Sequence, residues 1–286
     1  MRWVITALGV LLVAAVLRDI FHTLWHPKGD GAISRWLARG MWRVMSRLGS
    51  TTRSLAGPFI LVGVIGTWLV TMLTGWALIY WVHLPDGFAI SPDLDPSGRG
   101  GLLDAFYLST VVLGTLGFGD IVPTDGWLRL VTAAQALVGF ALLSAAVSWV
   151  LQIQPAVRRR RTLARHLTVL REAEDDVGAT DTAASTLEGL THAVVGVHQD
   201  LSQASPTYYF SEEDAHEALD TALPYAVELS ARASRSDDAR QRAAGAALSR
   251  ALDGLAAHLG RRFLRLDAPR DEVLRRYAAD HRHEAG

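Results

Sequence analysis

The residues with the clearest chemical capacity stand in one run, Thr115 to Asp120, with the sequence Thr-Leu-Gly-Phe-Gly-Asp. Gly117 and Gly119 have no Cβ and adopt positive φ without a clash, so successive backbone carbonyls can face one axis. The Thr115 hydroxyl adds a further oxygen at one end of this row. About four copies of the run around an axis would surround a cation with oxygens that replace its hydration shell. The run therefore predicts coordination of ions by the backbone.

A short apolar segment, residues 102–114, precedes this run and carries Asp104 in its first turn. A helix needs about 20 apolar residues to cross a bilayer core, so this one is too short and is predicted to re-enter the membrane. Irregular backbone at membrane depth is tolerated only where protein buries it or water lines it. The C-terminal end of the helix would direct its negative partial charge toward the central cavity and favour a cation there.

Longer apolar segments lie on both sides of the run and at the N-terminus. Residues 56–82 contain no charged side chain, and in the segment 127–153 the stretch from 130 onward contains none either. The N-terminal segment, within residues 1–26, is interrupted by an Arg-Asp pair near its far end. Each is long enough to cross a bilayer core. We therefore expect an all-α membrane protein in which residues 56–153 form one module, preceded by an extra span.

The composition divides the chain in two. Overall the 286 residues are 50% hydrophobic and 20% charged, but residues 1–153 contain 10 Lys/Arg and 8 Asp/Glu, against 18 and 21 in residues 154–286. None of the nine Trp lies beyond Trp149, which suits anchoring at membrane interfaces in the first half. The absence of Cys excludes disulfides and Cys-based metal sites. Basic stripes with interleaved aromatics, typical of nucleic-acid binding, are missing from the sequence.

The flanking charges predict the orientation in the membrane. Residues 24–55 contain six Lys/Arg and Arg158–Arg161 follow the third span, whereas residues 83–101, which follow the second span, contain three Asp and one Arg. By the positive-inside rule, residues 24–55 and 154–286 are expected in the cytoplasm, and the N-terminus and residues 83–126 outside. A cleaved signal peptide over residues 1–20 is the alternative, but it would put the arginine-rich stretch on the wrong side.

A stripe of arginines at every fourth position lies in the linker 27–55. Its members are Arg35, Arg39, Arg43 and Arg47. This spacing places them on one face of a helix, and the remaining apolar positions, Trp42 among them, indicate an amphipathic helix on the inner leaflet. A voltage sensor is the alternative, but residues 34–50 are too short and too polar to span a membrane. We expect contact with anionic lipid through this stripe and through Arg158–Arg161.

The run Thr115–Asp120 resembles the Thr-Val-Gly-Tyr-Gly-Asp signature of potassium channels, and Ile121–Thr124 extend the match. The flanking spans resemble the outer and inner helices of that family's pore module, so the resemblance covers residues 56–153, roughly a third of the chain. It implies a homotetramer that conducts K⁺ passively. The implied ion-coordinating filter residues are Thr115, Leu116, Gly117, Phe118 and Gly119. The side chains of Leu116 and Phe118 are expected to point away from the ions and brace the filter against the pore helix.

The resemblance also implies a role for a glycine in the inner helix. Gly139 lies twenty residues beyond Gly119, where family members commonly carry a glycine at which the inner helix bends. Glycine is frequent in membrane helices in any case. A close contact between helices, with small residues such as Ala136, Ala145 or Ala146, is therefore an equal alternative to a hinge.

Some residues around the motif depart from the family pattern. Phe118 lacks the Tyr hydroxyl that normally tethers the filter, and Gly114 replaces a Thr. Val111 stands where some bacterial relatives have a Glu that pairs with the Asp after the filter. Asp120, expected at the outer mouth, therefore needs another partner, and Tyr107 is positioned to be that partner. These changes affect the bracing of the filter and leave the row of carbonyls in place, so a weakly selective cation pore is the alternative to potassium selectivity.

The C-terminal half, residues 154–286, is helical in pattern and is expected to form a cytoplasmic domain. The first expected helix runs from Pro155 to near Gly178, and the second is capped by Thr180 or Asp181 and ends near Gln203. After a break at Ser205-Pro206, a capping box at Ser211–Asp214 is expected to open the third helix. A fourth helix is expected from about Asp237 to Leu266, and a short one after Pro269.

The sequence offers few other candidates for chemistry. It contains no Gly-rich phosphate loop and no nucleophile, base or metal triad, so neither an enzyme nor a bound cofactor is expected. Asp19, His22 and His26 share a helix face and are interpreted as interfacial polar residues rather than a metal or proton sensor. His192 and His198 are interpreted as structural. Two other classes are alternatives to a channel: a coupled transporter, which usually has four divergent repeats in one chain, and a membrane sensor acting through the helical domain.

Overall fold

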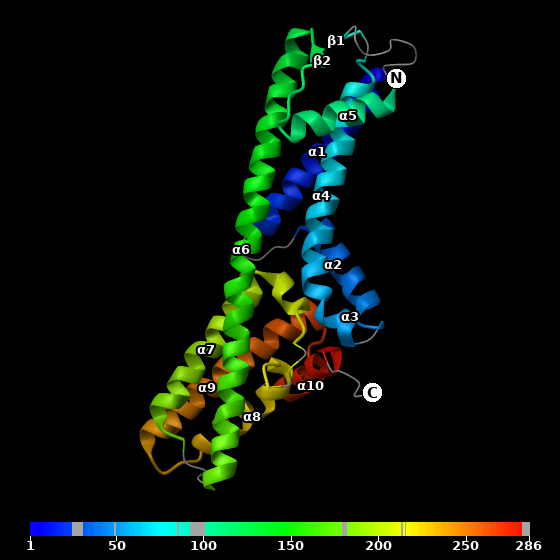
Figure 1. Ribbon diagram of the computed structural model, residues 1–286. Helices are drawn as coiled ribbons and strands as arrows, with labels where there is room; N and C mark the ends of the chain where they lie inside the picture. Colours follow the sequence, from blue (N-terminus) through cyan, green and yellow to red (C-terminus); the bar gives the residue numbers. More distant parts are fainter. Residues whose placement is uncertain are drawn as a thin grey trace. The chain divides into compact units, whose positions relative to one another are not determined.

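The computed structural model describes residues 1–24, 31–48, 50–84, 86–91, 101–178, 182–212, 214 and 216–281. The predicted all-α class is confirmed, because the described chain is almost entirely helical, with two three-residue strands (Figure 1). It divides into two compact units. The first contains Met1–Trp36 and Val62–Val150, and the second contains Leu37–Leu61 and Leu151–Gly286.

The N-terminal half contains α1 (Arg2–Leu24), α2 (Ala32–Met45), α3 (Ser50–Ser54), α4 (Ala56–Trp81), β1 (Phe88–Ile90), α5 (Leu102–Leu113), β2 (Ile121–Pro123) and α6 (Gly126–Val177). Of these, α1, α4 and α6 are long and apolar enough to cross a membrane, whereas α5 is an apolar helix too short to do so. This pattern matches the three spans and the short intervening helix that the sequence predicts, and the chain is a membrane protein.

Helices α4 and α6 pack as an antiparallel pair in the first unit (Figure 1). The rings of Trp68 and Trp149 lie 5.2 Å apart between them. Helix α1 packs closely along α4, because a Cβ built on Gly9 would lie only 2.5 Å from the carbonyl oxygen of Gly75. Such an approach is possible only between small residues, as is usual where membrane helices pack.

Asp19 of α1 lies where α1, α4 and the start of α2 meet. Its side chain is only 4% exposed and accepts hydrogen bonds from the backbone N–H of Ile33 and Ser34, at 2.9 and 3.2 Å, so it caps the N-terminus of α2. The Ser34 hydroxyl and the indole N–H of Trp68 also donate to it, at 2.6 and 2.9 Å. Asp19 is therefore a structural anchor for α2 and α4, which the sequence interpretation of interfacial polar residues missed. His26 lies outside the described residues.

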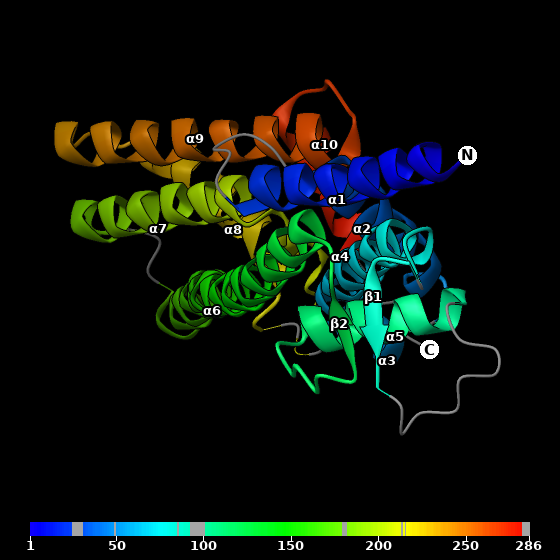
Figure 2. The ribbon, with the colours of Figure 1, turned by 90° about the horizontal axis from the view of Figure 1, so that it is seen from above.

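Strands β1 and β2 form a small antiparallel sheet in which Ala89 is paired with Val122 (Figure 2). The backbone N–H of Ser91 donates to the carbonyl of Asp120 at 2.8 Å, which extends this pairing. The sheet ties the chain after α4 to the segment that links α5 to α6.

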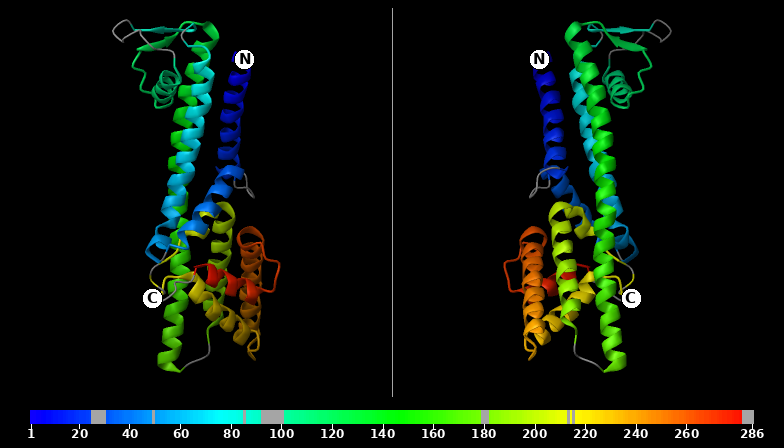
Figure 3. Two further views of the ribbon diagram at one scale, coloured as in Figure 1. Left: turned by 90° about the vertical axis from the view of Figure 1, so that its right-hand side faces the viewer. Right: turned by 90° about the vertical axis from the view of Figure 1, so that its left-hand side faces the viewer.

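The second unit contains the rest of α6, α7 (Ala184–Gln203), a 3₁₀ turn at Ser205–Tyr209, α8 (Leu219–Ala233), α9 (Ala239–Leu259), a π-helical turn at Gly260–Leu264 and α10 (Arg270–His281). Helices α7 and α9 lie side by side (Figure 3). Their buried positions recur at helical spacing: Leu187, Leu190, Val194, Val197 and Leu201 on α7, and Ala244, Leu248, Leu252, Leu255 and Leu259 on α9. These two stripes form the core of the unit.

The predicted helix boundary at Pro155 is wrong, because α6 runs through this residue without interruption. A proline inside a helix removes one backbone hydrogen bond and clashes with the preceding turn, at a cost of about 3 kcal/mol. The turns that follow are buried in the second unit through Ala156, Val157, Leu163 and Ala164, and this burial offsets the cost.

The predicted capping box at Ser211–Asp214 is also wrong, because α8 begins at Leu219 with Ala218 as its N-cap. Glu212 is 7% exposed and accepts from Arg160 and Arg161 instead, and a buried ion pair outweighs a local cap. Helix α7 has Ala183 as its N-cap, and Thr180 and Asp181 lie outside the described residues. Helix α9 has a side-chain cap, Asp238, which accepts from the backbone N–H of Arg240 at 2.9 Å.

Candidate functional site

The segment Thr115–Asp120, the glycine loop, hangs from the C-terminal turn of α5. Gly114 ends the helix, and its N–H donates to the carbonyl of Thr110 at 2.9 Å. The next two N–H groups, of Thr115 and Leu116, donate to the carbonyls of Val112 and Val111 at 3.0 and 2.9 Å. The last carbonyls of α5 are thus occupied by the glycine loop, so the position of this helical turn determines where the loop begins.

The backbone of the glycine loop is left-handed at every second residue. The φ angles are 57° at Thr115, 59° at Gly117 and 80° at Gly119. Because left-handed residues alternate with residues of negative φ, successive peptide planes can turn their carbonyls to the same side of the chain. A row of ion-coordinating carbonyls requires this arrangement. A β-branched residue such as Thr115 rarely adopts positive φ, and such strain of about 1–3 kcal/mol is typical of functional loops. The sequence motif alone did not predict the strain at Thr115.

The large side chains of the glycine loop point out of the chain's own core. Leu116 is 59% exposed and Phe118 is 65% exposed. That the two side chains brace the loop against α5 stays a prediction, and within one chain it is the backbone N–H of Leu116 that bonds to α5. Any cover for these two side chains has to come from outside the described chain.

Asp120 has the partner that the sequence suggested. The Tyr107 hydroxyl donates to Asp120 Oδ2 at 2.5 Å, and Asp120 Oδ1 accepts from the N–H of Ile121 at 3.0 Å. Val111, at the position of the family Glu, is 4% exposed and packs into the interior. The end of the glycine loop is therefore held by Tyr107 on one side and by the β1–β2 sheet on the other.

Gly139 of α6 lies against the end of α5. A Cβ on Gly139 would lie 2.0 Å from the carbonyl oxygen of Leu113, well inside any real contact. Helix α6 continues through Gly139. The geometry therefore supports the close-packing alternative, with the backbone of Leu113 on α5 as the neighbour of Gly139.

A buried polar group next to Gly139 was missed by the sequence analysis. Gln135 of α6 is fully buried, and its amide Nε2 donates to the carbonyl oxygen of Ser109 of α5 at 3.0 Å. The sequence did contain a signal, the polar amide of Gln135 inside an apolar span, because polar residues at such positions usually have a structural or functional role.

The arginine stripe of the linker is only partly on α2. Arg35, Arg39 and Arg43 lie on the helix, whereas Arg47 follows its end at Met45. Arg43 and Arg47 are exposed.

The face of α2 that was assigned to lipid is in part a protein contact. Trp42 is 6% exposed and its ring lies 5.7 Å from Tyr209 and 5.2 Å from His281. Its indole N–H donates to Asp280 at 3.1 Å. Trp42 is therefore packed inside the second unit.

The cluster Arg158–Arg161 also makes protein contacts. Arg159 forms two hydrogen bonds with Asp200, at 2.8 and 2.5 Å. Arg160 is 3% exposed, pairs with Glu212 at 3.0 Å and donates to the carbonyls of Thr207 and Phe210. Arg161 also pairs with Glu212, at 2.7 Å. The expected lipid contact is therefore wrong for the buried Arg160, whereas Arg158 is exposed.

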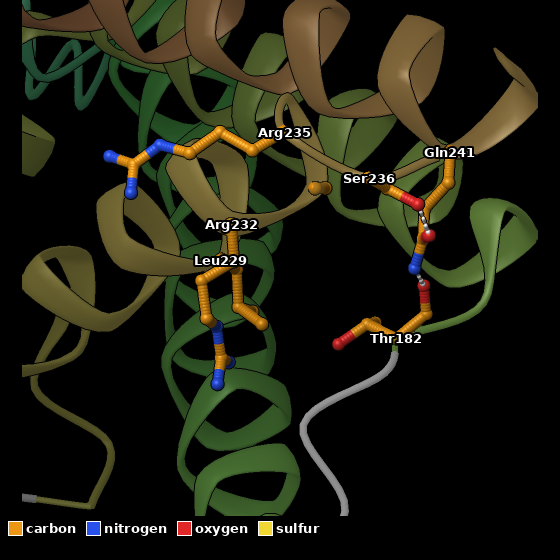
Figure 4. A pocket seen from close by; sticks show the side chains of 7 residues that line it. Thr182, Leu229, Arg232, Arg235, Ser236 and Gln241 are labelled. Atoms are coloured by element: carbon orange, nitrogen blue, oxygen red, sulfur yellow. Dashed lines mark hydrogen bonds between the residues drawn. The ribbon is translucent and has the colours of Figure 1, made fainter. Parts of the chain in front are cut away.

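The second unit contains a cavity of about 300 Å³ (Figure 4). Its lining residues are Thr182, Leu229, Arg232, Ala233, Arg235, Ser236 and Gln241. The polar groups of the wall are largely occupied: Arg232 pairs with Glu174 at 2.6 Å, and Gln241 donates to the carbonyl of Thr182 at 2.8 Å. Across the described residues, no cluster of three or more His, Asp or Glu side chains could hold a metal ion.

Comparison with known proteins gives matches over the same region. The model of a family described as ion channel matches residues 59–153. The uncharacterized membrane protein YdjJ of Bacillus subtilis is 29% identical over 166 residues, which cover 57% of this chain and 48% of YdjJ. Protein LctB of Bacillus caldotenax is 37% identical over 107 residues, which cover 36% of this chain and 75% of LctB. LctB of Geobacillus stearothermophilus is 36% identical over 83 residues, 28% of this chain and 61% of that protein.

The chain thus spans about half the length of YdjJ. No solved structure matches. The family match begins in α4, contains α5 and the glycine loop, and ends in α6. These are the elements that the geometry brings together around the loop, and the chain belongs to the ion-channel family of membrane proteins.

Proposed function

We propose that this chain is one subunit of a homotetrameric, passive potassium-selective channel that conducts through the backbone carbonyls of the glycine loop. The observation that carries the proposal is the left-handed backbone at Thr115, Gly117 and Gly119, directly after the last turn of α5. Such a backbone allows a row of carbonyls to face one axis and to replace the water around an ion. Flux down an electrochemical gradient through this row needs no catalytic group.

Several features favour a cation as the permeant ion. Carbonyl and hydroxyl oxygens, including that of Thr115, are the ligands, and the C-terminal end of α5 directs its negative partial charge toward the start of the loop. Asp120 adds a carboxylate at the loop's far end, where it raises the local concentration of cations. A weakly selective cation pore shares these features and differs only in how the row of carbonyls discriminates between ions.

The need for several copies follows from the geometry of one chain. A single row of carbonyls cannot surround an ion, and Leu116 and Phe118 beside it are exposed. Helix α6 also carries a run of exposed apolar side chains: Leu130, Leu137, Phe140, Leu143 and Val147. Neighbouring copies around a common axis would cover the side chains of the loop and complete the ring of oxygens.

The orientation is part of the proposal. The positive-inside rule favours a cytoplasmic second unit and an N-terminus outside. Arg43, Arg47 and Arg158 are exposed on the side expected to face the inner leaflet and would contact anionic lipid there, each contributing about 1 kcal/mol. Arg35 and Arg39, half-buried on α2, would lie beside them.

The test is flux of K⁺ and Na⁺ into liposomes that contain the purified full chain, with Gly117→Ala as the variant and Gly66→Ala as its matched control. A Cβ at either position meets nothing within 4 Å, but Gly117 has φ +59° and Gly66 does not have positive φ. Alanine costs about 1–2 kcal/mol in a left-handed conformation. We expect wild type and Gly66→Ala to conduct K⁺ and Gly117→Ala to conduct little.

Absence of K⁺ flux from the wild type, or equal flux from wild type and Gly117→Ala, would overturn the channel proposal. Equal flux of Na⁺ and K⁺ through the wild type would overturn only the selectivity. The assembly is tested separately by the mass of the detergent-solubilised particle, for which a monomer would contradict the tetramer.

A further inference from the structure

Gln135 sits in the apolar part of α6 and is 0% exposed. Burial of a primary amide away from water is unfavourable unless its donors and its acceptor have partners. Its partners among the described residues lie on two other helices of the first unit, so its side chain connects α6 to both α4 and α5.

The hydrogen bonds form a chain across the three helices. Tyr80 of α4 donates its hydroxyl to Gln135 Oε1. Gln135 Nε2 donates to the carbonyl oxygen of Ser109 at 3.0 Å and lies 3.2 Å from the Ser109 hydroxyl. The Ser109 hydroxyl donates back to α4, to the carbonyl oxygen of Leu73 at 3.0 Å. The chain therefore begins and ends on α4, and α5 is held between its two ends.

One helical turn further along, α6 touches the same part of α5 again. Gly139 follows Gln135 by four residues, and Leu113 follows Ser109 by four. Residues four apart share one face of a helix. Because the Cβ position of Gly139 lies 2.0 Å from the carbonyl oxygen of Leu113, the two backbones approach as closely as glycine allows. Gln135 and Gly139 thus hold the turn Ser109–Leu113 at two points.

This turn is the one from which the glycine loop hangs. The carbonyls of Thr110, Val111 and Val112 lie within it and accept from the N–H groups of Gly114, Leu116 and Thr115. A shift or rotation of the turn is passed through these short bonds to the left-handed residues of the loop. The spacing of oxygens around an ion is sensitive to such shifts, because selectivity depends on the number and placement of the coordinating carbonyls.

We propose that Gln135 is a positioning residue for ion selectivity, which acts through the turn Ser109–Leu113 and is itself oriented by Tyr80. Gln135 does not touch the ion. This inference rests on the proposed function, since it assigns the control of selectivity at that same loop.

The test measures the K⁺/Na⁺ flux ratio of the full chain in liposomes for Gln135→Leu, Tyr80→Phe and the double variant. Thr74→Val is the control, because among the described residues the Thr74 hydroxyl donates within its own helix, to the carbonyl of Val70 at 2.7 Å. We expect Gln135→Leu to lower the ratio about five- to tenfold, the size that the loss of one net hydrogen bond produces. Tyr80→Phe is expected to lower it by less and to add nothing in the Gln135→Leu background, because Tyr80 acts through Gln135.

The outcomes separate this inference from the proposed function. No flux from the wild type would overturn the proposed function and this inference with it. Selective flux from the wild type with an unchanged ratio in Gln135→Leu would overturn the inference alone. If Gln135→Leu fails to fold, Tyr80→Phe, which removes one hydroxyl, decides in its place: a ratio equal to that of Thr74→Val contradicts the inference. Additive effects of the two substitutions would contradict the route from Tyr80 through Gln135.

Discussion

Replacement of Gly139 by alanine places a methyl group where the structure has no room for one. The new Cβ would lie 2.0 Å from the carbonyl oxygen of Leu113, and ordinary contact begins at 3.4 Å, so the two backbones have to separate by roughly 1.4 Å. Neither side can give way by a change of rotamer, because both contacting groups belong to helix backbones.

The expected cost follows from these distances. Overpacking of a filled core costs about 1–3 kcal/mol, and a backbone clash of this depth belongs at the upper end. Alanine regains about 1 kcal/mol of helix propensity over glycine, which leaves a net destabilisation of about 2 kcal/mol. At about 2–4 °C per kcal/mol, the transition of the first unit should fall by about 4–8 °C.

The measurement is thermal unfolding of the detergent-solubilised chain followed by Trp fluorescence. Eight of the nine Trp belong to the first unit and Trp42 belongs to the second, so this signal reports mainly on the first unit. Gly66→Ala is the control, because a Cβ at Gly66 meets nothing within 4 Å and the substitution should leave the transition unchanged or raise it. Equal transition temperatures for Gly139→Ala and Gly66→Ala would refute the close-packing assignment and return Gly139 to the role of a hinge.

Two further predictions concern charge. In the structure the Tyr107 hydroxyl donates to Asp120 at 2.5 Å, and Asp120→Asn keeps an acceptor for it but removes the negative charge. Single-channel conductance in a planar bilayer should therefore fall at low salt. It should recover near 1 M salt, where a charge is screened within about 3 Å. An equal loss at all salt concentrations would argue against an electrostatic role. In the second unit, burial lowers the pKa of His258 to about 4, with His198, Arg262 and Arg261 adding to the shift and the carbonyl of Leu201 opposing it. Because the folded pKa lies below the unfolded value of about 6.5, the unfolded chain binds more protons between these values, and stability is lost as the pH falls from about 6.5 to 4. His258 is only partly buried, so we expect a loss of about 1–2 kcal/mol after solvent screening; this is measured as the thermal transition followed by far-ultraviolet circular dichroism against pH. His258→Leu should remove much of this pH dependence and His192→Leu should not, and the same slope in both variants would contradict the assignment.

The sequence was sufficient for the elements that carry their own signal. The length of α5, its acidic first turn and the glycines at 117 and 119 predicted a short apolar helix followed by a left-handed loop, because these properties depend on local backbone sterics. The Tyr107–Asp120 hydrogen bond was predicted from the family's pattern of residues around the filter, and the structure has it.

Other features depended on distant parts of the chain and could not be predicted. The side chain of Asp19 has its hydrogen-bond partners on α2 and on Trp68, and that of Gln135 has its partners on α4 and α5. The local sequence around either residue does not predict these distant partners. Helix α6 continues past Pro155 because the second unit buries its next turns, which overrides local propensity. The motif at Ser211 failed as a cap for a related reason, since its Glu212 pairs with Arg160 of another helix.

The exposed Leu116 and Phe118 beside a single row of carbonyls have a consequence in genetics. If each copy contributes one row to a ring of four, a chain with a faulty loop still assembles through its normal helices and disables the whole ring. In a cell that makes normal and faulty chains in equal amounts, random mixing leaves only about one complete ring in sixteen. A substitution at Gly117 would therefore be dominant over the normal allele, whereas a substitution that prevents folding of the chain would be recessive.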